Sequence, residues 1–305
     1  MREAEWNRRR ILRTVAAAAV APAGSFAAEP NIRWGLGAVT WVVKAGKASP
    51  KWEEILGDIK AAGFEGVEPF TTPTLQVNDE NMGVLEKLLP RYNPLRVCAI
   101  YWADKWDKAE EHERMLKECH RFLGYLKRFR SDRLLIGPPG AEVKDEKAAI
   151  SNMAKIMNAI GKIALEQYAI KVSIHPHMNS LIENPRQTDQ LFEETDPRYF
   201  GFAPDTMQIW VGGGDPVGMI KKYLKRVVYL HYKDSRPFQR SRNPQDHGIE
   251  LGGGHIDFPA IHRMLRDIGY KGWIAMDVAK TDLTALESAR ANMAYINKVL
   301  KPIYT

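Results

Sequence analysis

The chain has 305 residues, 45% of them hydrophobic, which is enough apolar material for one large α/β domain or two smaller ones. Its formal net charge of +7 is a mild excess, and no block of Lys and Arg is interleaved with aromatic residues, so we expect no nucleic-acid partner. The two cysteines, Cys98 and Cys119, fall in a predicted strand and a predicted helix, and we expect both to be free, buried thiols.

The first 27 residues have the composition of an export signal. Residues 7–13 read NRRRILR, and an alanine-rich apolar run follows to residue 28, with small residues at Ser25 and Ala27. Paired arginines followed by Ile-Leu are similar to the twin-arginine type, so we expect cleavage near Ala27 and an exported, periplasmic protein. A frayed N-terminal helix is the alternative, but it leaves the order of these parts unexplained. No apolar run reaches the ~20 residues that span a bilayer, so we expect no membrane span in the mature chain.

Apolar, β-branched runs alternate with amphipathic stretches along the rest of the chain. The predicted strands are residues 32–40, 66–70, 96–101, 133–136, 171–175, 199–205, 227–231 and 273–278. The predicted helices are residues 52–62, 80–89, 108–129, 146–167, 186–194, 216–223, 258–268 and 284–299.

Strict alternation of strands and helices predicts a parallel sheet, and eight such units in roughly 250 residues match the length of a (β/α)8 barrel. We therefore predict the α/β class, with a single TIM barrel over residues 28–305. An open, doubly wound sheet is the alternative, but it usually has a G-x-G-x-x-G turn after its first strand, and this chain has none there. The polar stretch 237–254 would then be a loop on the catalytic face, long enough to act as a lid.

Polar side chains stand at the C-terminal ends of several predicted strands, where a barrel brings them to one mouth. They are Glu68, His175, His177, Asp205, His231 and Asp277. Each ends or interrupts an apolar run, where burial of an unpaired charge costs several kcal/mol, so each needs a partner. Singly, each has a structural explanation, such as a helix cap for Asp205 or an ion pair with Lys233 or Lys280 for Asp277. Together, imidazoles and carboxylates from consecutive strands suit one divalent cation.

Three stretches of the sequence resemble one known family. They are GFAPDT from residue 201, VGGGDPVGMIKKYLKRVVYLHYKDSR from residue 211, and LGGGHIDFPAIHRMLRDIGYKGWIAMD from residue 251. On these stretches the chain resembles the sugar phosphate isomerase/epimerase family, which has a xylose isomerase-like TIM barrel. The HPH of residues 175–177 is similar to the inosose-dehydratase-like branch. The resemblance implies one divalent metal ion held by Glu, Asp, His and Glu from strands five to eight.

The resemblance assigns roles to individual positions of this chain. The four metal ligands would be His175 in place of the first glutamate, then Asp205, His231, and Asp277 in place of the last glutamate. Substrate contacts fall to Arg236, just beyond the seventh strand, and to Glu183 in SLIEN. Glu68 matches a glutamate on the second strand.

The chain departs from the family pattern at three of these positions. Family members commonly have Asp-Thr-Gly-His after the sixth strand, and this chain has Asp-Thr-Met-Gln, so Gln208 replaces the histidine. Its amide could hydrogen-bond a substrate hydroxyl but cannot titrate. In the epimerases of the family the two ligand glutamates also move the substrate proton. With His175 and Asp277 in their places, both the reach and the basicity of these side chains differ from those of glutamate. Metal binding tolerates these changes more easily than the epimerase mechanism does, which leaves room for a lyase.

The resemblance implies a metal-dependent isomerase, epimerase or dehydratase that acts on a sugar, keto-sugar or cyclitol through an enediolate. The cofactor would be one divalent ion, Mn²⁺, Zn²⁺, Co²⁺ or Mg²⁺, and the base would be Glu68, His177 or Asp277. A second hypothesis is a catalytically reduced barrel that binds carbohydrate or assists a partner enzyme, and homo-oligomerisation is left open. A three-metal endonuclease of the same fold ranks last, because eight histidines do not supply its ligands.

Overall fold

The structure is a computed structural model that describes residues 32–45, 50–69, 76–236, 247–279 and 281–304. The predicted export signal lies outside the described residues and remains a prediction. Residues 237–246, which form most of the predicted loop on the catalytic face, also lie outside them.

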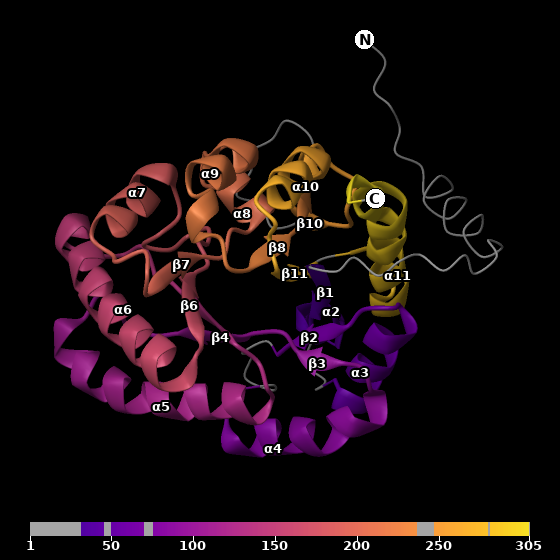
Figure 1. The fold of residues 1–305 in the computed structure, drawn as a ribbon, viewed down its shortest axis with the longest axis horizontal. Helices are drawn as coiled ribbons and strands as arrows, with labels where there is room; N and C mark the ends of the chain where they lie inside the picture. The colour runs from indigo at the N-terminus through magenta and orange to yellow at the C-terminus, as the bar shows by residue number, and fades with distance from the viewer. Residues whose placement is uncertain (1–31, 46–49, 70–75, 237–246, 280, 305) are drawn as a thin grey trace, which may run out of the picture.

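Parallel strands form a closed barrel at the centre of the molecule, and helices surround it (Figure 1). The strands are β1 (Ile32–Gly37), β2 (Gly66–Glu68), β3 (Arg96–Val97), β4 (Ile100–Ala103), β5 (Arg133–Gly137), β6 (Lys171–Ile174), β7 (Phe200–Phe202), β8 (Leu230–Tyr232) and β11 (Gly272–Met276). They form two ladders, β3-β2-β1-β11-β8 and β4-β5-β6-β7. A backbone hydrogen bond from Cys98 to Val67 makes β3 and β4 parts of one strand, and a parallel bridge between Asp205 and His231 joins β7 to β8. The described residues thus form an eight-stranded barrel, which confirms the predicted fold class.

Helices follow the strands and cover the outside of the barrel. They are α2 (Val39–Ala45), α3 (Trp52–Ala61), α4 (Asp79–Leu88), α5 (His112–Arg128), α6 (Glu146–Tyr168), α7 (Pro185–Glu193), α8 (Thr206–Val211), α9 (Pro216–Lys222), α10 (Phe258–Asp267) and α11 (Ala285–Tyr295). Short 3₁₀ segments lie at Leu89–Tyr92, Ala109–Glu111, Leu224–Arg226 and Lys301–Ile303, with a π-helical segment at Ile296–Leu300. The eight predicted helices all have a counterpart here. Many begin at a side chain that accepts from a first-turn amide, as Asn184 and Thr284 do in full capping boxes.

Two short helices and a two-stranded ribbon were not predicted. The first predicted strand ends three residues early, at Gly37, and Thr40 lies in α2 although Val, Thr and Trp favour strands. Tertiary contacts hold this helix, because Thr40 Oγ1 donates to Val278 O (2.6 Å) and Trp41 Nε1 donates to Asp58 (2.9 Å). Helix α8 begins shortly after β7, and the ribbon pairs β9 (Asp234–Ser235) with β10 (His247–Ile249) in antiparallel fashion.

The inside of the barrel combines large and small side chains. Its central cluster contains Cys98, Ala99, Leu135, Ala203, Tyr229, Trp273 and Ala275. Cys98 and Ala99 are neighbours that both pack in this cluster, which explains the interruption between β3 and β4 and the reversed alternation after it. Trp273 lies across Gly66, where a Cβ would stand 2.6 Å from the indole ring. Cys98 and Cys119 are both buried and free, as predicted.

No helix in the described part of the chain is long and apolar enough to cross a membrane.

Replacement of Gly66 by alanine should destabilise the protein, because the new methyl group would collide with the Trp273 ring and lie 3.0 Å from Cys98 Cβ. We expect a loss of about 1–3 kcal/mol in the free energy of unfolding, measured by urea titration. Gly124→Ala in α5 is the matched control, because nothing lies within 4 Å of a Cβ there. It should stabilise the protein slightly through helix propensity. Equal stability of the two variants would contradict this account of the barrel interior.

His262 on α10 should make the fold sensitive to acid. Its side chain is fully buried and stacked on Trp34 (5.5 Å between ring centroids), and burial lowers the pKa of its imidazole from 6.5 to about 3. The unfolded chain therefore binds a proton that the folded chain excludes, and stability falls as the pH drops from about 6.5 towards 3. His262→Leu should flatten this loss by ~1.4 kcal/mol per pH unit in urea titrations across that range. Identical slopes in both proteins would rule the mechanism out.

Candidate metal centre

Five polar residues of the barrel lie at the C-terminal ends of its strands. Glu68 is the last residue of β2, His231 lies within β8, and His175 and Asp277 directly follow β6 and β11. Asp205 comes three residues after β7 and is the N-cap of α8. Because the C-terminal ends of parallel strands meet at one face of a barrel, these side chains converge on the same mouth.

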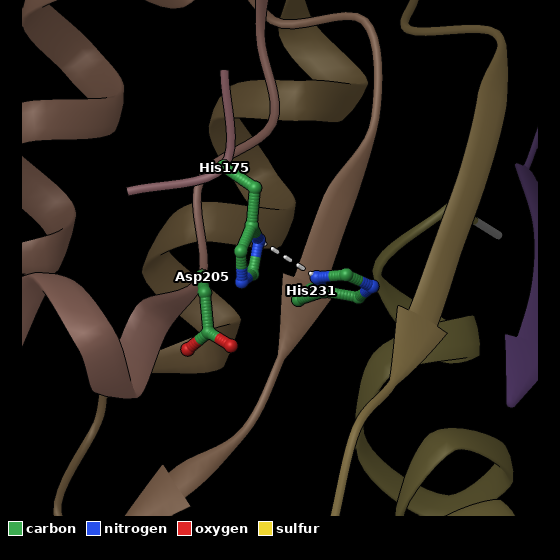
Figure 2. A group of neighbouring side chains, drawn as sticks. All are labelled: His175, Asp205 and His231. Carbon is green, nitrogen blue, oxygen red and sulfur yellow. Dashed lines mark hydrogen bonds between the residues drawn. The ribbon is translucent and has the colours of Figure 1, made fainter. Parts of the chain in front are cut away.

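His175, Asp205 and His231 form a compact buried group (Figure 2). Their ligand atoms all lie within 4.8 Å of one another, and His175 Nδ1 is 3.0 Å from His231 Nδ1. Asp205 Oδ1 accepts from the Gln208 amide (2.9 Å), whereas Oδ2 is buried and accepts no hydrogen bond from the described residues. A buried carboxylate oxygen without a hydrogen bond, beside two imidazole nitrogens, is a donor set that suits a divalent cation of the Zn²⁺ or Mn²⁺ kind.

Glu68 and Tyr229 fix the orientation of His231. The Tyr229 hydroxyl (2.7 Å) and His231 Nε2 (2.8 Å) both donate to Glu68 Oε2, and all three side chains are buried. Burial opposes protonation of His231, but the Glu68 carboxylate outweighs it and raises the pKa of the imidazole. Burial, and then the charge of His231, lower the pKa of His175. Donation from Nε2 to a carboxylate directs Nδ1 of His231 to the cluster, which is the usual support of a metal-binding histidine.

Asp277 does not join the cluster and pairs with Lys233 instead. In the register of β8 and β11, His231 stands beside Ala275 and Tyr232 beside Met276, so the next pair is Lys233 and Asp277. Lys233 Nζ lies 2.6 Å from Asp277 Oδ2 and 3.4 Å from Asp205 Oδ2. Burial disfavours the ammonium, but the two carboxylates outweigh it and raise the pKa of Lys233, while Lys233 overcomes the effect of burial and lowers the pKa of Asp277.

The charges of this mouth leave room for a divalent cation. Glu68, Asp205 and Asp277 are three carboxylates, and Lys233 is the ammonium that lies among them. With neutral histidines the formal charge is −2, which one divalent ion balances. The buried donor atoms and the charge therefore both fit the implied cofactor.

The other predicted site residues line the loop that follows β6 or lie beyond β9. His177 is half-buried and its Nδ1 donates to Met178 O (2.8 Å), while Gln208 Oε1 accepts from the Met178 amide (2.8 Å). Glu183 Oε2 accepts from the Asn179 amide (3.2 Å). Gln208 and Glu183 thus hold the loop beside His175, and Arg236 is exposed. Their predicted roles towards a substrate remain predictions.

Two residues of the site could have been found from strand alternation. Tyr229 and Lys233 lie two positions before and after His231, so a strand at this point turns all three side chains to the same face. The sequence indicated Lys233 as a supporting residue and a possible partner for Asp277, and it did not single out Tyr229.

Removal of the Glu68 carboxylate should weaken metal binding. Glu68→Ala leaves the buried Nε2–H of His231 without its acceptor, so we expect about 10- to 100-fold weaker binding of Zn²⁺ in calorimetric titrations. Tyr229→Phe is the control that keeps the carboxylate and should lose less affinity. Unchanged affinity in Glu68→Ala would argue against the orienting contact.

Comparison with known proteins finds relatives that share one name, inosose dehydratase. The inosose dehydratase of Lactiplantibacillus plantarum is 26% identical over an alignment 313 positions long, and this alignment covers 90% of this chain and 98% of the relative. The inosose dehydratase of Bacillus velezensis is 27% identical over an alignment 302 positions long, and this alignment covers 88% of this chain and 97% of the relative.

Solved structures show the same fold at lower identity. The IolI protein, solved with a bound zinc atom, has a TM-score of 0.71 at 15% identity, covering 87% of this chain and 97% of its own. A sugar phosphate isomerase/epimerase from Parabacteroides distasonis has a TM-score of 0.70 at 18% identity, covering 94% and 98%. Residues 56–299 match the family described as xylose isomerase-like TIM barrel. This chain belongs to the xylose isomerase-like TIM barrel family.

Proposed function

We propose that the protein is a metal-dependent dehydratase or isomerase/epimerase that acts on a keto-cyclitol or keto-sugar. The observation that carries the proposal is the buried group of His175, Asp205 and His231 at the barrel mouth. The curated relatives named inosose dehydratase support a cyclitol ketone as substrate and loss of water as the reaction. The zinc atom in the IolI structure supports metal binding by a protein of this fold.

His175, Asp205 and His231 would hold the ion. A divalent ion bound there supplies Lewis acidity towards the carbonyl and the adjacent hydroxyl of the substrate. Glu68 and Tyr229 keep His231 in its orientation, so their role is to position this metal-binding histidine. The metal identity is left to experiment among Mn²⁺, Zn²⁺, Co²⁺ and Mg²⁺.

His177 is the base that the geometry favours. Its Nδ1 donates to Met178 O, which leaves Nε2 as the nitrogen that accepts a proton, and its ring is 6.0 Å from that of His175. Glu68 already accepts two hydrogen bonds at one oxygen, and Asp277 is paired with Lys233. His177 would take the proton next to the carbonyl, and the C–H electrons would move into an enediolate.

The fate of that enediolate separates the two reactions. When the electrons return and expel a β-hydroxyl, which leaves as water after protonation, the product is a dehydrated ketone. When a proton returns to carbon, the product is an isomer or epimer. The departures at His175 and Gln208 from the epimerase pattern favour the first outcome.

The proposal predicts that metal-loaded protein dehydrates an inosose, with formation of the unsaturated ketone followed by ultraviolet absorbance and NMR. Removal of the metal with a chelator should abolish turnover, and restored metal should recover it. His177→Ala should lower kcat by ~10²- to 10⁴-fold while it keeps its metal. His120→Ala on the exposed face of α5 is the control and should keep full activity.

The hypothesis of a catalytically reduced barrel makes the opposite prediction for the same experiment. If metal-loaded protein binds the ketone but gives neither product nor deuterium exchange at the α-carbon, the proposed activity is wrong and the binding role is favoured.

A further inference from the structure

Lys233 occupies a central place among the buried charges of the barrel mouth. Only 4% of its side-chain surface is exposed, and its ammonium contacts Asp277 at 2.6 Å and Asp205 at 3.4 Å. Its backbone is also fixed, because its N–H donates to Thr206 Oγ1 (3.0 Å) and its carbonyl accepts from the same hydroxyl (2.7 Å). Gly248 of β10 lies over the aliphatic stem. Lys233 is therefore held in place on several sides.

Asp277 lies beside Gly37 of β1, and the residue that follows it is tied to α2. Its Oδ1 stands above Gly37, where a Cβ would lie only 3.3 Å away. The next residue, Val278, is tied through its carbonyl to Thr40 on α2. An aspartate on a fixed backbone has little reach, so Asp277 can join the three-residue cluster only by giving up Lys233.

Such an exchange would be costly. Asp277 carries the shorter of the two contacts to Lys233, and its loss would leave a buried ammonium with the longer contact to Asp205 alone. In addition, Asp205 would then be the remaining carboxylate partner of the ammonium while it also binds the metal ion. The intact Lys233–Asp277 ion pair is therefore more stable than an arrangement in which Asp277 leaves Lys233 to become a fourth metal ligand.

We propose that Lys233 limits the metal centre to three protein ligands, His175, Asp205 and His231, by holding Asp277 in an ion pair. The inference rests on the metal centre of the proposed function and goes beyond it by fixing the ligand number and the residue that sets it. Two imidazoles and one carboxylate leave coordination positions for oxygen atoms of the substrate. This set favours Zn²⁺, Co²⁺ or Mn²⁺ over Mg²⁺, which prefers oxygen ligands.

Metal titrations of variants test the inference without any measurement of turnover. Asp277→Asn should still bind one Zn²⁺ or Co²⁺ per chain, with affinity within about threefold of the wild type, whereas Asp205→Asn should lose at least about 100-fold. Lys222→Met, which removes an exposed lysine paired with Asp189, is the matched control and should change nothing. Circular dichroism checks that each variant is folded.

A double-mutant cycle separates ligand exclusion from a general effect of charge. Lys233→Met should free Asp277, tighten Co²⁺ binding by about tenfold or more, and change the visible absorption of bound Co²⁺. If Asp277 is the added ligand, Lys233→Met together with Asp277→Asn should restore the wild-type absorption. An altered absorption that persists in the double variant would overturn the inference.

The wild-type protein provides a test that needs no variant to fold. A crystal structure with Zn²⁺ should keep the Lys233–Asp277 pair, with three protein ligands on the ion. Coordination of the ion by Asp277, or a loss of metal affinity in Asp277→Asn as large as in Asp205→Asn, would overturn this inference but leave the metal centre in place. Wild-type protein that binds no divalent ion would overturn the metal centre as well, whereas metal binding without turnover would overturn only the proposed activity.

Discussion

The contact between β7 and β8 closes the barrel, and the rest of the site depends on it. Few backbone contacts join these strands: Val228 N–H donates to Phe202 O, and His231 N–H donates to Pro204 O (2.9 Å). The second of these contacts places Asp205 beside His231 in parallel register. Closure of the barrel and assembly of two members of the candidate metal centre are therefore one structural event.

The polar residues of the mouth are compatible with burial because they satisfy one another. Glu68 accepts from Tyr229 and His231, and Lys233 lies between two carboxylates. An isolated charge in this place would be strongly destabilising. Asp205 Oδ2 is satisfied less well, since it lies 3.4 Å from Lys233 Nζ and accepts no hydrogen bond from the described residues. A buried carboxylate oxygen that has this longer contact but no hydrogen bond is most simply explained by an ion that the site is built to hold.

Much of the barrel could be predicted from sequence, and the reasons for the failures are specific. Each strand is an apolar run that a parallel sheet buries on both faces, so alternation with amphipathic helices revealed all eight units. Helix α2 was not predicted because it is stabilised through Thr40 and Trp41, whose hydrogen-bond partners are 238 and 17 residues away in the chain. The partner of Asp277 could not be chosen between Lys233 and Lys280, because that choice depends on the register of β8 and β11. This register pairs strands that lie more than 40 residues apart in the chain, and the apolar pattern used to find the strands does not reveal it.

The segment after β8 shows why that register is strongly specified. His231 and Lys233 face the mouth, whereas Asp234 turns away and accepts from the amides of Gly252, Gly254 and Ile256. A slip of one residue would exchange these two faces. It would place the Lys233 ammonium among backbone N–H groups that need an acceptor and bring a fourth carboxylate into a mouth that already has three. Both changes are electrostatically unfavourable, so the order of charged residues along this short segment selects the one register in which the candidate metal centre exists.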